Sequence, residues 1–119
     1  MKVEKIHHVA ILVKDLEKTG KLFAELFGFE YSGPNEHKEA DFRNLVTPLG
    51  INLITPLSPD GVTTRTLNQR GEGLCELSLT VSNVAEATAE MKSRGIRQVG
   101  AARFHPKDLH GVLIELTEN

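Results

Sequence analysis

The sequence lacks most of the features that mark a specialised location or a familiar catalytic motif. It has one cysteine in 119 residues, so an intramolecular disulfide is excluded. Its apolar runs are of strand length, far short of the roughly 20 residues that span a membrane. The net charge is −2 with both signs interspersed, which does not indicate a nucleic-acid or membrane partner. No glycine-rich phosphate loop, Ser-His-Asp set or Cys-x-x-Cys pair is present.

The composition is that of an ordinary globular protein. Hydrophobic residues make up 39% of the chain and charged residues 25%. We expect residues 1–119 to form a single domain that buries a real core. The N-terminal segment MKVEKIHHVAI predicts a strand and has no signal-peptide organisation. With the single cysteine, this favours a reduced, cytoplasmic setting.

The chain repeats one pattern twice. Residues 6–16 (IHHVAILVKDL) and 74–84 (LCELSLTVSNV) each alternate like a strand and then lead into a helix start. Each half ends in a matching strand, INLIT at 51–55 and IELTE at 114–118. We therefore expect two repeats, at about 1–57 and 73–119, with 58–72 as a linker that is rich in turn formers and lacks periodicity.

Each repeat is predicted to be a β-α-β-β-β unit. Asp15 is a candidate N-cap of the first helix, and Asn83 with Glu86 forms a capping box for the second. Gly28 and Gly95 are natural residues for the C-terminal caps. The remaining strands are expected at 28–32, 41–47, 50–55, 96–103 and 111–117. Two such units make an α+β protein with eight strands.

Four polar side chains occupy related positions in the two repeats. Superposition of the halves pairs His8 with Glu76 and Asn52 with Glu115. By strand alternation, His8 and Glu76 lie on the face opposite the apolar one. Glu115 can share that face only if the register of the last strand holds, because a slip by one residue would turn it away. The duplication thus predicts a central site.

These segments carry a resemblance to a known family. The opening KIHHVAILVKDLEK, the segment GLCELSLTVSNV and above all FHPKDLHGVLIEL resemble the vicinal-oxygen-chelate superfamily, which includes glyoxalase I, extradiol dioxygenases and methylmalonyl-CoA epimerase. The hairpin at 105–116 resembles the epimerase branch, and the DPDGxxIE-like ending of glyoxalase I is absent. The resemblance implies a cup-shaped, eight-stranded mixed sheet with the helices outside.

The resemblance also implies a divalent metal inside the sheet. The family's ligand positions correspond to His8, Asn52, Glu76 and Glu115. Glu76 stands where the family usually has histidine, and Asn52 where glutamine or glutamate is usual. One imidazole, two carboxylates and an amide would suit Mn²⁺, Mg²⁺, Fe²⁺ or Co²⁺ better than a thiophilic ion. The alternative is that the metal has been lost and the protein only binds a small molecule.

The implied activity is that of a metal-dependent isomerase or lyase that stabilises the enolate of an acyl thioester, as in methylmalonyl-CoA epimerase. Glu115 matches one acid/base group of the epimerases. Asp41 is the candidate for the second, with Glu39 as a near alternative and an exposed structural charge as the other interpretation. Lys107 could meet a phosphate of coenzyme A, and the alternative is that it only serves the hairpin turn. A homodimer is also expected, because related short members of the family form pairs.

Two other functions stay open from the sequence. One is a non-catalytic small-molecule-binding protein of the same fold. The other is a glyoxalase-type lyase, similar to lactoylglutathione lyase. An ion pair between Glu76 and an arginine or lysine would favour the binding protein, whereas metal ligation by Glu76 would favour the enzyme.

Overall fold

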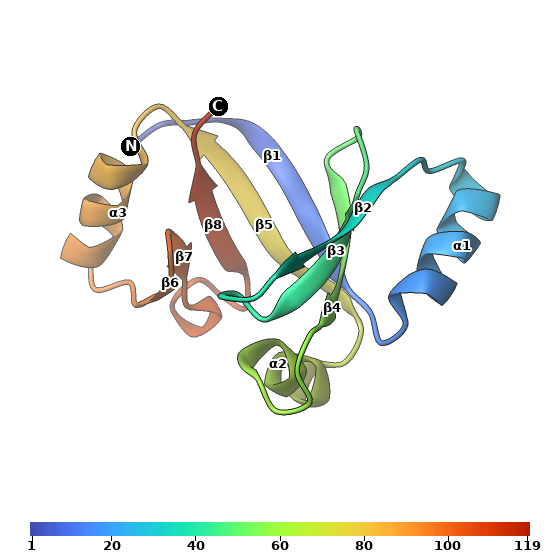
Figure 1. The fold of residues 1–119 in the computed structure, drawn as a ribbon. Helices are drawn as coiled ribbons and strands as arrows, with labels where there is room; N and C mark the ends of the chain where they lie inside the picture. The colour runs from blue at the N-terminus through green and yellow to red at the C-terminus, as the bar shows by residue number, and fades with distance from the viewer. The chain divides into compact units, whose positions relative to one another are not determined.

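The computed structural model describes residues 1–119, and Figure 1 labels their elements. They fall into two compact units, which we call the terminal unit (Met1–Val9 with Cys75–Asn119) and the middle unit (Ala10–Leu74). The elements in chain order are β1 (Val3–Leu12), α1 (Leu16–Phe27), β2 (Ser32–His37), β3 (Phe42–Val46), β4 (Ile51–Pro56), α2 (Val62–Arg70), β5 (Gly73–Val81), α3 (Val84–Ser93), β6 (Gln98–Gly100), β7 (Arg103–Phe104), the 3-10 turn η1 (Pro106–Asp108) and β8 (Leu113–Thr117).

The strand order repeats between the two halves of the chain. The hydrogen-bonded order is β2-β3-β4-β1-β5-β8-β7-β6, so each half has its first strand beside its last. β5 and β8 are parallel, whereas β2 with β3, β3 with β4 and β6 with β7 are antiparallel. The predictions of a duplicated unit and of an α+β fold with an eight-stranded mixed sheet are confirmed. None of the three α-helices is long and apolar enough to cross a membrane.

The core of the terminal unit lies between α3 and strands β5, β7 and β8. Its fully buried members are Val81, Ala87, Phe104 and Leu116. The Asn83 side chain accepts a hydrogen bond of 2.9 Å from the backbone N–H of Glu86, which confirms the predicted N-cap of α3. β5 and β8 run side by side in the same direction (Figure 1).

The middle unit is built around α1 and strands β3 and β4. Val13, Leu16 and Leu53 form its buried cluster. Asp15 accepts a hydrogen bond from the N–H of Lys18, and Gly28 ends α1 with a φ of 70°, so both predicted caps of this helix are confirmed.

One predicted strand is misplaced. The segment 28–32 was expected to be a strand, but β2 occupies Ser32–His37. Phe29 and Tyr31 instead pack against α1: the Phe29 ring lies 6.2 Å from that of Phe23, and the Tyr31 hydroxyl donates to the carbonyl of Gly20 at 2.9 Å. Aromatic residues favour a strand by pattern, but here they cover a helix.

The predicted linker and the predicted strand 96–103 also differ from the structure. Residues 58–72 contain α2, which the sequence pattern did not indicate because no α2 residue is buried. α2 is attached through polar contacts, including a hydrogen bond of 3.1 Å from Thr63 Oγ1 to the carbonyl of Ala40. The segment 96–103 is broken into β6 and β7 by a turn in which Ala102 has a φ of 52°.

Candidate metal and active site

Strand register brings a row of polar side chains onto one face of the terminal unit. In the parallel pair β5–β8, Ser78 lies opposite Glu115. In the antiparallel pair β7–β8, Arg103 lies opposite the same Glu115. Glu76 precedes Ser78 by two residues and therefore points to the same side as Ser78. The register that the sequence required for Glu115 to face Glu76 is thus present.

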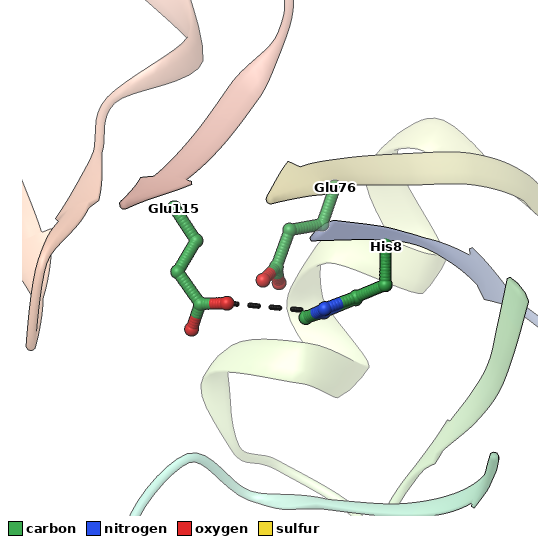
Figure 2. A group of neighbouring side chains, drawn as sticks. All are labelled: His8, Glu76 and Glu115. Carbon is green, nitrogen blue, oxygen red and sulfur yellow. Dashed lines mark ion pairs between the residues drawn. The ribbon is translucent and has the colours of Figure 1, made fainter. Parts of the chain in front are cut away.

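Three of the four predicted metal ligands come together on this face. The ligand atoms of His8, Glu76 and Glu115 all lie within 4.8 Å of one another. Figure 2 shows the imidazole of His8 and the carboxylate of Glu115 pointing toward each other, with the carboxylate of Glu76 beside them. The Nε2 atom of His8 is 3.8 Å from Oε1 of Glu115, and the Glu76 side chain is only 8% exposed.

One tautomer of His8 can act as a metal ligand. Its Nδ1 lies 2.8 Å from Nδ1 of His7, so one of these two atoms carries the shared proton. When His8 donates, its Nε2 keeps a free lone pair on the side of Glu115. Burial lowers the pKa of His8 below 6.5, the Glu115 carboxylate opposes this, and His7 and Arg103 lower the pKa further. The neutral imidazole is therefore the favoured form at pH 7.

Burial strongly affects the Glu76 carboxyl group. Burial raises its pKa to about 7. The Arg103 guanidinium opposes this shift, and the neighbouring Glu115 carboxylate adds to it. A buried carboxylate beside a second carboxylate is the environment in which an additional cation is most stabilising.

Arg103 and Ser78 complete the cluster, and the sequence analysis missed both. Arg103 Nη2 lies 2.9 Å from Oε2 of Glu115, and its Nε lies 3.6 Å from Oε2 of Glu76. Ser78 Oγ donates a hydrogen bond of 2.9 Å to Oε1 of Glu115. The available signals were the two-residue spacing of Ser78 from Glu76 and the position of Arg103 one residue before the buried Phe104.

Asn52, the fourth predicted ligand, lies on β4 in the middle unit. Its Oδ1 atom is buried and has no hydrogen-bond partner. A buried amide oxygen without a donor is unusual in a protein and is suited to accept one or to ligate a cation. Its role in metal binding stays a prediction.

Asp41 has a clear structural role in the middle unit. It lies in the turn before β3 with a φ of 60°. Its Oδ1 accepts hydrogen bonds from the N–H and Oγ of Ser58, at 3.1 and 2.7 Å, while its Oδ2 is buried without a partner. The carboxylate is therefore held inside the turn rather than exposed, whereas the nearby alternative Glu39 is exposed. The catalytic role of Asp41 stays a prediction.

Lys107 lies in η1 of the terminal unit and is exposed. Its backbone N–H donates to Nδ1 of His105 at 3.0 Å, so His105 serves as the N-cap of this turn. An exposed ammonium group is free to meet an anion, and contact of Lys107 with coenzyme A stays a prediction.

The donor set of the terminal unit fits a hard divalent cation. It offers two carboxylates and one imidazole, which suit Mn²⁺, Mg²⁺, Fe²⁺ or Co²⁺. With both carboxyls ionised, the guanidinium of Arg103 neutralises only half of their charge. On both geometric and electrostatic grounds, the cluster is therefore a candidate site for a divalent cation.

Comparison with known proteins identifies the family. The profile of the glyoxalase/bleomycin resistance protein/dioxygenase superfamily matches residues 7–113. The chain belongs to this superfamily. The resemblance seen in the sequence is thereby confirmed.

Several similar proteins within the superfamily are methylmalonyl-CoA epimerases. Mitochondrial methylmalonyl-CoA epimerase of Mus musculus is 29% identical over 98% of this chain and 74% of its own length. The crystal structure of methylmalonyl-CoA epimerase from Mycobacterium tuberculosis is 30% identical with a TM-score of 0.81, over 98% of this chain and 88% of that one. A methylmalonyl-CoA epimerase in complex with methylmalonyl-CoA and NH4+ is 25% identical with a TM-score of 0.84, over 99% and 96% of the two chains.

Proposed function

We propose that this protein is a divalent-metal-dependent epimerase of a coenzyme A thioester, with methylmalonyl-CoA as the first substrate to test. The observation that carries the proposal is the convergence of His8, Glu76 and Glu115 within 4.8 Å on one face of the terminal unit. The similarity to proteins named methylmalonyl-CoA epimerase supports the substrate class and favours an isomerase over a lyase.

The metal would be held by Nε2 of His8 and by the carboxylates of Glu76 and Glu115, with Asn52 as the fourth ligand that the sequence predicts. A bound divalent ion supplies a Lewis acid that stabilises the negative charge of a thioester enolate. The neutral imidazole of His8 and the harder carboxylates favour Mn²⁺, Mg²⁺, Fe²⁺ or Co²⁺ over a thiophilic ion.

The acid/base work falls to carboxylates of this chain. Epimerisation removes the α-proton from one face of the substrate and returns a proton to the other, so two positioned groups are needed. Glu115 is the first: Ser78 contacts its Oε1 and Arg103 its Oε2, so the carboxylate is fixed in one orientation. Asp41 is proposed as the second, on the basis of the sequence resemblance.

The remaining features of the proposal concern partners. The exposed ammonium of Lys107 offers a cation to a phosphate of coenzyme A.

We further propose a cytoplasmic homodimer, an expectation that rests on the sequence. Light scattering after size-exclusion chromatography tests the oligomeric state. A mass near twice the 13.1 kDa of the chain would support the dimer.

Elemental analysis of the purified protein tests the metal site. We expect stoichiometric metal in the wild type and its loss in Glu76→Gln and Glu115→Gln. Glu86→Gln is the matched control, because Glu86 is an exposed carboxylate on α3 in the same unit. Absence of metal from the wild type under every loading condition would overturn the metal-dependent proposal.

Solvent exchange tests the chemistry. In D₂O, an enolate mechanism incorporates deuterium at the α-carbon of methylmalonyl-CoA, which mass spectrometry detects directly. Loss of the Glu115 base should lower the exchange rate by about 100-fold or more. Exchange at the rate of the enzyme-free solution in metal-loaded wild type would exclude epimerisation of this substrate.

One observation favours a second function. Arg103 lies 3.6 Å from Glu76, which is the ion pair that the sequence associates with a non-catalytic binding protein. That function predicts saturable binding of an acyl-CoA by calorimetry together with no metal and no solvent exchange. The same two experiments therefore separate the two functions.

A further inference from the structure

We propose that Arg103 is an internal counter-cation that competes with the divalent metal for Glu76 and Glu115 and thereby sets the metal affinity of the site. This inference rests on the metal site of the proposed function. It assigns a positioning and affinity-setting role to a residue that the sequence resemblance does not name.

One guanidinium contacts both carboxylates. Nη2 of Arg103 lies 2.9 Å from Glu115 Oε2, and Nε lies 3.6 Å from Glu76 Oε2. The backbone places it there, because Arg103 is the register partner of Glu115 in the β7–β8 pair. The next residue, Phe104, is fully buried and pairs with Ile114, which fixes β7 against β8.

The two carboxylate oxygens of Glu115 contact different partners. Its Oε1 faces His8 Nε2 at 3.8 Å and accepts the hydrogen bond of Ser78, whereas its Oε2 faces Arg103. A metal at the cluster would therefore share Glu115 with the guanidinium. The same holds for Glu76, whose Oε2 is the atom nearest to Arg103.

The charges make these two cations competitors. The Glu76 and Glu115 side chains are 8% and 17% exposed, so ionising both without a partner is costly. Arg103 offsets that cost when no metal is bound. A divalent ion that enters the cluster meets the fixed positive charge of Arg103 in a region of low dielectric, and the repulsion weakens metal binding.

The affinity for Mn²⁺, measured by calorimetry on the metal-free full chain, tests the proposal. We expect Arg103→Gln to bind Mn²⁺ roughly tenfold to a hundredfold more tightly than the wild type. Arg103→Lys keeps the charge and should return the affinity toward the wild-type value. A residue with only a structural role would not produce tighter binding when removed.

Arg97→Gln is the matched control. Arg97 belongs to the same unit and also pairs with a carboxylate, Asp108, at 2.9 Å, but away from the cluster. Its removal should leave Mn²⁺ affinity unchanged within about twofold. A similar gain in Arg97→Gln would show that the effect is a general one of net charge, and the proposal would be rejected.

A second comparison covers the case in which Arg103→Gln does not fold, since it leaves two carboxylates unpaired. The double variant Glu76→Gln/Arg103→Gln has no carboxylate at position 76, so Glu115 is the one carboxylate of the cluster left without the guanidinium. We expect this double variant to recover part of the Mn²⁺ affinity that is lost in Glu76→Gln, and so to bind Mn²⁺ more tightly than that single variant. Equal or weaker binding would overturn the role of Arg103.

The outcomes separate this inference from the proposed function. A wild type that binds Mn²⁺ and an Arg103→Gln variant that binds it no better would reject the inference and keep the metal site. A wild type without metal and a variant that binds it would support the inference and reject metal-dependent epimerisation by the wild type. Failure of all variants to bind would reject both.

Discussion

Ser78 Oγ donates a hydrogen bond of 2.9 Å to Oε1 of Glu115, a residue 37 positions later in the chain. The two are register partners in the parallel pair β5–β8, and Ser78 is completely buried. A buried hydroxyl directed at a carboxylate fixes the orientation of that carboxylate. Ser78 is thus a positioning residue for the metal and base function proposed for Glu115.

Ser78→Ala should weaken the site and the fold together. Loss of a hydrogen bond to a charged group costs about 1–3 kcal/mol of unfolding free energy, measured by urea denaturation. Metal affinity should fall by roughly tenfold, as for other supporting hydrogen bonds of metal ligands. Ser93→Ala is the control, because Ser93 donates to the carbonyl of Glu90 at the exposed end of α3. Unchanged metal affinity in Ser78→Ala would contradict the positioning role.

The stability of the metal-free protein should depend on Glu76. Its pKa is about 7 in the folded protein and 4.5 in the unfolded reference, so the folded state binds more protons between these values. Stability contributed by this group is therefore greatest at low pH and falls as pH rises from about 4.5 to about 7. A shift of this size corresponds to about 3 kcal/mol.

Urea denaturation at a series of pH values in the presence of a chelator measures this effect. Glu76→Gln has no titratable group at this position, so the difference in unfolding free energy between wild type and variant isolates the effect of Glu76. That difference should change steadily between about pH 4.5 and about pH 7 and be constant above this interval. A difference that does not vary with pH would show that Glu76 titrates normally.

The sequence predicted which polar side chains come together better than it predicted the path of the chain between them. His8, Glu76 and Glu115 follow from strand alternation and duplication, because those depend on local period and on one register. The side-chain N-caps of α1 and α3, Asp15 and Asn83, were likewise predicted from the local sequence. These are the patterns that one sequence can reveal.

The misses share a physical cause. Phe29 and Tyr31 were assigned to a strand, but tertiary packing on α1 overrode their propensity. α2 has no buried face, so its sequence shows no helical period of apolar residues. Arg103 was overlooked because its partner Glu115 is set by the pairing of β7 with β8, and such a contact is not visible within either strand.

His8 should titrate at a lower pH than an ordinary histidine. Burial is the main cause of its lowered pKa, and the Glu115 carboxylate acts in the opposite direction. In the metal-free protein, the NMR signal of the His8 ring should therefore shift with a midpoint below 6.5. Because the folded pKa is lowered, this group destabilises the fold as pH falls through that range.

Two variants test the cause of the His8 shift. Glu115→Gln removes the opposing charge and should lower the midpoint further, whereas Arg103→Gln removes a like charge and should raise it. An unchanged midpoint in either variant would show that the substituted neighbour does not influence the pKa of His8.

Asp41→Asn should separate the structural role of Asp41 from its proposed catalytic role. Asparagine can keep an acceptor oxygen toward Ser58, which Asp41 Oδ1 contacts at 2.7 and 3.1 Å, and it tolerates the φ of 60°. It also adds little volume in a turn where the Asp41 carboxylate packs against Gly61. The free energy of unfolding should therefore change by less than about 1 kcal/mol.

If Asp41 is the second acid/base group, solvent exchange at the α-carbon should nevertheless fall by about 100-fold or more in Asp41→Asn, because the amide cannot take up the proton. Ser58→Ala provides the complementary control, since it removes the hydroxyl donor of the turn without changing the carboxylate itself. That variant should lose stability and keep most of its exchange rate. Wild-type exchange in a folded Asp41→Asn protein would show that Asp41 has only a structural role in the turn. The second acid/base group would then have to be another residue.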